Sequence, residues 1–169
     1  GGNISTLEDA TNSIKSGADK ILINSNLNRK FTDQISEIFG DQSIVGGLDL
    51  IVEKNEIFQL INGQKKHINI FDKLKELLKL NLGEIKITFV DSEGTRKGFN
   101  HILASEIIAL SDRSIIFEGG FSSLEDINLA FQNKINSIAL GSIITFSDNN
   151  IFKIKQFLEN MNYEMRLRN

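Results

Sequence analysis

Short apolar segments alternate along the chain with longer segments in which apolar residues recur every three or four positions. The short segments have the length and composition of buried strands, and they cover residues 20–24, 43–49, 84–90, 114–117 and 137–140. The longer segments have the periodicity of amphipathic helices. They cover residues 5–15, 28–39, 70–82, 101–110, 122–133 and 150–160, with a short extra helical turn at 142–146. The pattern therefore predicts one helix followed by five strand–helix units.

Residues 50–61 interrupt this order. Apolar and polar residues alternate on either side of Lys54-Asn55, which is typical of a β-hairpin, and Asn62-Gly63 marks its end. We therefore expect a hairpin to leave the main sheet after the strand at 43–49.

Polar residues and glycines gather directly after every predicted strand. They are Asn24-Ser25, Asp49, the segment 91–95, Gly119-Gly120 and Gly141-Ser142. Apolar strands that alternate with helices form parallel sheets covered by those helices. Functional groups after all the strands are typical of TIM barrels, whereas an open doubly wound sheet concentrates them at one point. The expected fold class is therefore α/β, of the TIM (βα)8-barrel family, as a single domain over residues 1–169.

The segment 117–126 carries the clearest chemical signal. A predicted strand ends in Gly119-Gly120, and Ser122 and Glu125 then stand three residues apart, as in the capping box that opens a helix. Glycines let the backbone approach a ligand closely, and the first N–H groups of a helix point towards a bound anion. This combination predicts a phosphate-binding loop. The alternative is a Gly-Gly turn that serves strand-to-helix geometry alone.

The first nine residues repeat this phrase with one insertion. Gly1-Gly2-Asn3 precedes the segment 5–9, and each copy is followed by a helix, an apolar strand and a small polar pair. Two copies of one phosphate-binding loop predict two phosphate sites. The alternative is that repeated strand–helix units resemble each other because they pack alike.

Composition limits the classes of protein and of partner. The chain has 169 residues, a formal net charge of −3 and no basic stripe, so nucleic acid is not an expected partner. No apolar stretch approaches the roughly 18 residues of a membrane span, and no signal peptide is visible. Cysteine is absent, which agrees with a cytoplasmic location. His67 and His101 are isolated from any cluster of metal-binding residues, so neither a metal nor another cofactor is expected.

Several phrases of the chain resemble the cyclase subunit of imidazole glycerol phosphate synthase, a (βα)8 barrel of histidine biosynthesis. They are Gly17-Ala18-Asp19-Lys20, Phe39-Gly40-Asp41-Gln42-Ser43, Gly83-Glu84-Ile85, the run from Asp91 to Phe99, and the pairs Gly119-Gly120 and Gly141-Ser142. The run from Asp91 contains Asp-x-(Asp/Glu)-Gly-Thr-x-x-Gly, which is more typical of this family than of barrels in general. The resemblance extends over the whole sequence.

The resemblance implies a substrate, a ribulosyl formimino aminoimidazole nucleotide with a phosphate at each end. Asp49 matches a catalytic aspartate at the end of the family's fifth strand, where it would act as general acid and base. A strand-end aspartate that only caps a loop is the alternative. One phosphate site would comprise Glu93, Gly94, Thr95, Gly119, Gly120, Gly141 and Ser142, with Glu93 in place of the family's usual aspartate. The other would comprise Gly2, Asn24 and Ser25, beside Asn3 in place of a third glycine.

The resemblance also implies a protein partner. Lys20 and Glu84 begin their predicted strands and therefore lie at the opposite mouth of the barrel. The family has a charged gate there, through which ammonia enters from a glutaminase subunit. Ordinary surface charge is the alternative interpretation of both residues.

The family has eight strand–helix units, whereas this sequence predicts five strands. The expected fold is thus an N-terminally truncated partial barrel, without the family's first three strands and without the second catalytic aspartate, which lies on the first of them. Residues 1–169 alone are therefore expected to be a poor cyclase. Two alternatives stay open. One is a related barrel that feeds ammonia to sugar amidation in surface polysaccharide synthesis, and the other is a non-catalytic barrel that binds phosphate or a glutaminase.

A partial barrel leaves two strand edges unpaired. The strands at 20–24 and 137–140 are short, apolar and free of proline, so nothing in them opposes pairing with another chain. Apolar side chains of the strands are also expected to face the open interior. They are Ile21, Ile23, Ile44, Leu48, Ile85, Ile87 and their neighbours. Both features predict a homodimer or a larger assembly.

Overall fold

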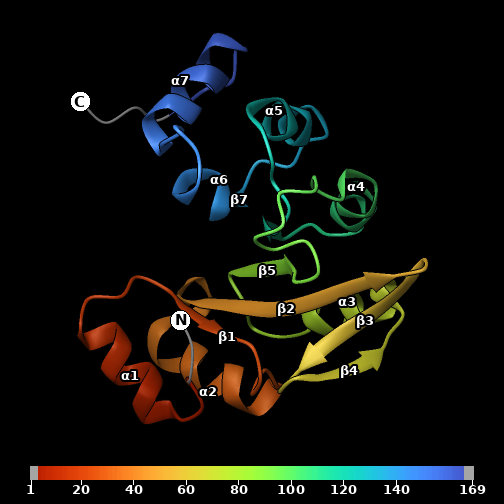
Figure 1. The fold of residues 1–169 in the computed structure, drawn as a ribbon. Helices are drawn as coiled ribbons and strands as arrows, with labels where there is room; N and C mark the ends of the chain where they lie inside the picture. The colour runs from red at the N-terminus through yellow and green to blue at the C-terminus, as the bar shows by residue number, and fades with distance from the viewer. Residues whose placement is uncertain (1–3, 166–169) are drawn as a thin grey trace.

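A single sheet of seven strands forms the centre of the computed structural model, which describes residues 4–165 (Figure 1). The strands are β1 (Ile21–Ile23), β2 (Ile44–Glu53), β3 (Glu56–Ile61), β4 (Gln64–His67), β5 (Glu84–Phe89), β6 (Ser114–Glu118) and β7 (Ile138–Ala139). Their order is β4-β3-β2-β5-β6-β7, and β1 pairs with the first residues of β2. The neighbours among β1, β2, β5, β6 and β7 are parallel. Within residues 4–165 the sheet does not close, so the predicted α/β partial barrel is confirmed.

Helices follow the parallel strands in the predicted order. They are α1 (Leu7–Lys15), α2 (Arg29–Phe39), α3 (Ile70–Leu78), α4 (His101–Ala109), α5 (Leu124–Gln132), the short α6 (Ser142–Thr145) and α7 (Ile151–Asn160), with a 3-10 turn at Asp41–Ser43. In Figure 1 they succeed one another around the sheet from α1 and α2 to α5 and α7. No helix of the described residues is both long and apolar enough to cross a membrane.

Side-chain caps fix where these helices begin. Asparagine is the N-cap of four of them, and each cap oxygen accepts a backbone N–H of the first turn. The four caps are Asn28, Asn69, Asn100 and Asn150. An N-cap residue has a non-helical backbone, so the helices at 28–39 and 150–160 begin one residue later than their periodicity predicted.

The predicted hairpin is present and longer than expected. Strand β2 continues past Asp49 to Glu53 and turns through Lys54-Asn55, both with positive φ, into the antiparallel β3. A second turn at Asn62-Gly63 leads into β4, which the sequence did not predict. All four residues of β4 are polar and exposed. This strand therefore lacks the alternation of apolar and polar residues by which strands are identified in a sequence.

The apolar strand residues face the helices and not the interior of the partial barrel. Ile21, Ile23, Ile44, Leu48, Ile85 and Ile87 are at most 3% exposed, in one core with residues of α1 to α5. The expectation that they lie open to the barrel interior was therefore wrong. Since successive strand residues point to opposite faces, the interior face carries Lys86 and Thr88, which alternate with Ile85 and Ile87.

Candidate functional site

A cavity of about 300 Å³ lies at the carboxyl ends of β5, β6 and β7. We call it the β6–β7 cavity. It is lined by Glu93, Gly94, Gly119, Gly120, Gly141 and Ser142, together with Glu118, Phe121, Ala139, Thr145 and Phe146. Three separate loops thus bring together six of the seven residues expected at one phosphate site. The seventh, Thr95, does not line the cavity, and its hydroxyl donates to the Ser92 carbonyl at 2.8 Å within its own turn.

Close backbone contact explains the glycines of this cavity. Gly120 has a φ of +92°, and a Cβ at this position would lie 2.4 Å from the carbonyl oxygen of Gly98. The Gly98 N–H donates to the Gly120 carbonyl at 3.1 Å, so the loops that follow β5 and β6 are held against each other. Any side chain at position 120 would separate them.

The N-cap of the helix after Gly119-Gly120 lies one residue later than predicted. The N-cap of α5 is Ser123, whose hydroxyl accepts the Asp126 N–H at 3.1 Å, so the pairing of Ser122 with Glu125 was wrong. The first copy has the same arrangement, since Thr6 caps α1 and accepts the Asp9 N–H at 3.1 Å. The two copies of the repeat therefore have the same cap hydrogen bond at the starts of α1 and α5. The glycines of the first copy, including Gly2, lie outside the described residues.

A second cavity of about 120 Å³ contains Asp49. We call it the Asp49 cavity. It is lined by Asn24, Ser25, Gly47, Asp49 and the hairpin residues Gln59, Leu60, Ile61, Asn62 and Gly63. Asn24 Nδ2 donates to Asp49 Oδ2 at 3.1 Å, so the predicted catalytic aspartate lies beside the residues expected at the other phosphate site. A Cβ on Gly47 would lie 1.3 Å from Asn24 Oδ1, and glycine at this position therefore leaves room for the asparagine.

Three charged side chains connect the two cavities. Burial raises the pKa of Asp49, while the Lys86 charge and the Asn24 hydrogen bond oppose this rise. Lys86 forms an ion pair with Glu118, which also accepts the Thr88 hydroxyl at 3.2 Å. Asp49 lines one cavity and Glu118 the other, and Lys86 projects from the strand between them. A carboxylate that resists ionisation beside a cation has the properties needed to exchange a proton with a ligand.

Sequence reasoning missed Lys86 and Glu118. The signal was present, because Glu84, Lys86 and Thr88 alternate with apolar residues along one predicted strand. The register of the sheet pairs Thr88 with Asp49 on one side and with Glu118 on the other. Paired residues of neighbouring strands point to the same face, which brings these polar groups together.

The opposite end of the sheet contains the other predicted pair. Lys20 Nζ lies 2.8 Å from Glu84 Oε1, and their side chains are 43% and 23% exposed. Lys20 directly precedes β1 and Glu84 begins β5, so their ion pair spans the intervening β2 at the amino-terminal ends of the strands. The structure therefore brings together the two residues expected at the ammonia gate.

A mostly parallel sheet whose parallel strands are followed by helices and end in polar residues defines the chain as a protein of the βα-barrel class, with the sheet open over residues 4–165. Comparison with known proteins identifies the family. Residues 1–150 match the family described as Histidine biosynthesis protein, and the chain belongs to this family.

Individual relatives agree with this family. Over 99% of its length the chain is 29% identical to the imidazole glycerol phosphate synthase subunit HisF of Natranaerobius thermophilus, 30% to that of Dictyoglomus turgidum and 32% to that of Bacillus cereus. It spans 68% of the length of the first two relatives and 69% of the third.

Proposed function

We propose that the chain is a cyclase of imidazole glycerol phosphate synthesis, which uses ammonia to close an imidazole ring on a nucleotide that carries a phosphate at each end. The observation that carries this proposal is the position of Asp49, a half-buried carboxylate in contact with Asn24 and linked through Lys86 to the β6–β7 cavity. The relatives named above are subunits of that synthase, which favours this activity over sugar amidation.

Each part of the site has a role in this proposal. Asp49 acts as the general acid and base, and Asn24 orients its carboxylate through the 3.1 Å hydrogen bond. Backbone N–H groups of the Gly119-Gly120 and Gly141-Ser142 loops bind one phosphate. Gly141 has no side chain with which to cap α6, so no side-chain cap competes with an anion for the first N–H groups of that helix. Gly2, Asn24 and Ser25 bind the second phosphate. Glu93 and Gly94 line the cavity beside the first phosphate, and Thr95 orders the loop that follows β5 through the hydrogen bond from its hydroxyl to the Ser92 carbonyl.

Ammonia is supplied by a glutaminase subunit at the opposite end of the sheet. The ion pair of Lys20 and Glu84 supports this assignment, because a charged gate needs paired groups at the amino-terminal mouth of the barrel. We place this complex in the cytoplasm, where a soluble biosynthetic pathway operates.

Ammonia-dependent turnover tests the proposed function. We expect the chain, extended by the upstream strand–helix units of the family, to convert the bis-phosphate nucleotide with ammonia alone. Residues 1–169 without them should be slower by about 10²–10⁴-fold, because one acid–base group is then missing. Glutamine should replace ammonia only when a glutaminase is added, and Glu84→Gln should affect only the glutamine-driven rate. An extended chain that is inactive with ammonia would contradict the proposal, whatever its phosphate affinity.

We also propose that residues 1–169 self-associate through strand edges. In the described residues β1 pairs only with β2, and β7 only with β6, so each has one unpaired edge. Sedimentation at micromolar concentration should give a dimer or larger species, and Leu22→Lys on β1 should weaken it, since charge on an edge strand opposes pairing. Glu56→Lys on β3, which is paired on both sides, is the control. A stable monomer would contradict this prediction.

A further inference from the structure

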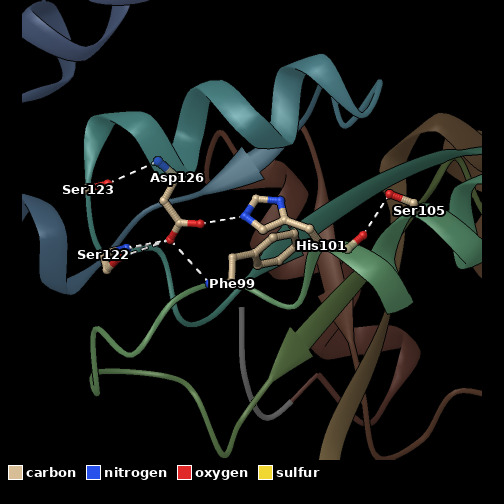
Figure 2. A network of polar contacts seen from close by, with 6 residues as sticks. All are labelled: Phe99, His101, Ser105, Ser122, Ser123 and Asp126. Carbon is tan, nitrogen blue, oxygen red and sulfur yellow. Dashed lines mark hydrogen bonds and ion pairs between the residues drawn. The ribbon is translucent and has the colours of Figure 1, made fainter.

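The carboxylate of Asp126 joins three segments beside the β6–β7 cavity (Figure 2). Its Oδ2 accepts the backbone N–H of Ser122 at 3.0 Å, the Ser122 hydroxyl at 3.2 Å and the backbone N–H of Phe99 at 3.3 Å. Its Oδ1 lies 2.6 Å from His101 Nε2. One side chain at the start of α5 thus connects the loop after β6, the loop after β5 and the start of α4.

The polar contact of the His101 ring is the one with Asp126. Its side chain is 15% exposed, and that of Asp126 is 11% exposed. The ring Nδ1 is buried and has no hydrogen-bond partner within residues 4–165, so Asp126 alone orients the ring through a polar contact. Since Asp126 Oδ1 can only accept when ionised, Nε2 is the donor in this pair.

The repeated half of the molecule provides an internal comparison. Asp9 of the first copy accepts the Ser5 N–H at 3.1 Å, the Ser5 hydroxyl at 3.2 Å and the Thr6 N–H at 2.9 Å. These hydrogen bonds are exposed, and no histidine contacts Asp9 among the described residues. Helix capping therefore requires neither burial nor an imidazole. The histidine and the contact with a second loop are additions specific to the copy that borders the β6–β7 cavity.

Aromatic packing connects the pair of His101 and Asp126 to the β6–β7 cavity. Phe99 meets the His101 ring edge-on with centroids 5.0 Å apart, and it stacks on Phe121 with centroids 4.3 Å apart. Phe121 lines the cavity and directly precedes Ser122. The 3.1 Å hydrogen bond from Gly98 to Gly120 joins the same two loops one step nearer to the ligand. A shift of Asp126 would therefore move Gly120 and Phe121.

The charges of Asp126 and His101 also affect the binding of an anion in the β6–β7 cavity. An ionised Asp126 behind an anion-binding loop opposes the anion, and a protonated His101 cancels that charge. Asp126 is the only ionisable side chain in hydrogen-bond or ion-pair contact with His101 in the described chain. Glu125 beside it on α5, Glu106 on α4 and Lys97 before Phe99 are exposed. Of the two carboxylates that line the cavity itself, Glu118 is paired with Lys86 and Glu93 is exposed.

We propose that His101 is a positioning residue for the anion-binding loop 119–122, that it acts through Asp126, and that its protonated form supports the tighter binding of the anion. The inference rests on the proposed phosphate site. By linkage, an anion bound in the β6–β7 cavity should in turn favour the protonated imidazole.

Sulfate is the probe for this inference, because its charge is constant where histidine titrates. Calorimetry from about pH 5 to about pH 8 should show the affinity of the protein for sulfate falling as pH rises. His101→Gln should make the affinity independent of pH, and about 5-fold or more weaker than that of the unaltered protein at the acid end. His67→Gln is the matched control, since this exposed histidine of β4 contacts Phe58 and is remote in sequence from both loops. It should keep the pH dependence of the unaltered protein.

A second measurement needs no variant and no anion. The amide resonances of Gly119 and Gly120 should titrate together with the His101 ring in NMR spectra of the unaltered protein. If these amides ignore the titration of His101, or if His101→Gln keeps the pH dependence of sulfate affinity, the positioning role is wrong and the phosphate site stands. If sulfate does not bind at any pH, the phosphate site is wrong and this inference with it.

Discussion

Replacement of Asp49 by asparagine is expected to lower the turnover number by about 10²–10⁴-fold, the usual contribution of a general acid–base group. The measurement is ammonia-dependent turnover in the chain extended by the upstream units of the family. The Michaelis constant should change little, because an asparagine retains the size of the side chain and its amide oxygen still accepts the hydrogen bond from Asn24. The effect should therefore appear in the chemical step and not in binding.

The stability of the Asp49→Asn variant separates this loss from unfolding. Burial raises the pKa of Asp49, so the ionised carboxylate is less favourable in the folded protein than in the unfolded chain. A raised folded-state pKa contributes stability below the unfolded value, and this contribution is lost as pH rises through the folded value. At neutral pH the melting temperature of the variant should therefore be no lower than that of the unaltered protein. At an acid pH where Asp49 is protonated, the substitution should not raise the melting temperature.

A matched control is available at the other end of the sheet. Asp112 is an exposed carboxylate in the turn before β6, at the amino-terminal ends of the strands. Asp112→Asn should leave turnover within a factor of about two, since it removes the same charge far from the chemistry. Near-normal turnover of Asp49→Asn would remove Asp49 from the mechanism, and an equal loss in both variants would assign the effect to net charge.

The elements predicted well from sequence are those whose signals are local. The helices at 28–39 and 150–160 were predicted to within one residue of their starts, because an Asn before a periodic apolar stretch lies at a helix start. Glycines and polar pairs after strands also marked residues that the fold brings together around the β6–β7 cavity. Both kinds of signal are contained within a few neighbouring residues, so no knowledge of the tertiary structure is required.

The wrong or missed predictions concern the face of the sheet on which a residue lies and the pairing of residues between strands. Both depend on residues that are distant in the sequence. Ile85 and Ile87 were assigned to the barrel interior because they are apolar, yet the helices provide the apolar environment and the interior face carries Lys86. The ion pair between Lys86 and Glu118 joins residues 32 positions apart. Only the register of β5 with β6 brings them together, and a single sequence does not contain that register.

Replacement of Gly120 by valine is expected to abolish phosphate binding at the β6–β7 cavity. Position 120 has a φ of +92°, and a Cβ there would lie 2.4 Å from the Gly98 carbonyl oxygen. The loops after β5 and β6 would have to separate, which breaks the hydrogen bond from Gly98 to Gly120 and moves the backbone N–H groups proposed to bind phosphate. Calorimetry with inorganic phosphate should then give no measurable heat of binding.

Gly17→Val distinguishes this effect from backbone strain alone. Gly17 has a similar φ of +103°, but a Cβ there meets no atom within 4 Å. Both variants should carry a conformational strain of about 1–3 kcal/mol, which a domain with a margin of roughly 5–15 kcal/mol tolerates. Only Gly120→Val should also lose phosphate, because only Gly120 lies where two loops meet beside the cavity. If both variants fold and bind phosphate equally well, the anion is not held by the Gly119-Gly120 loop.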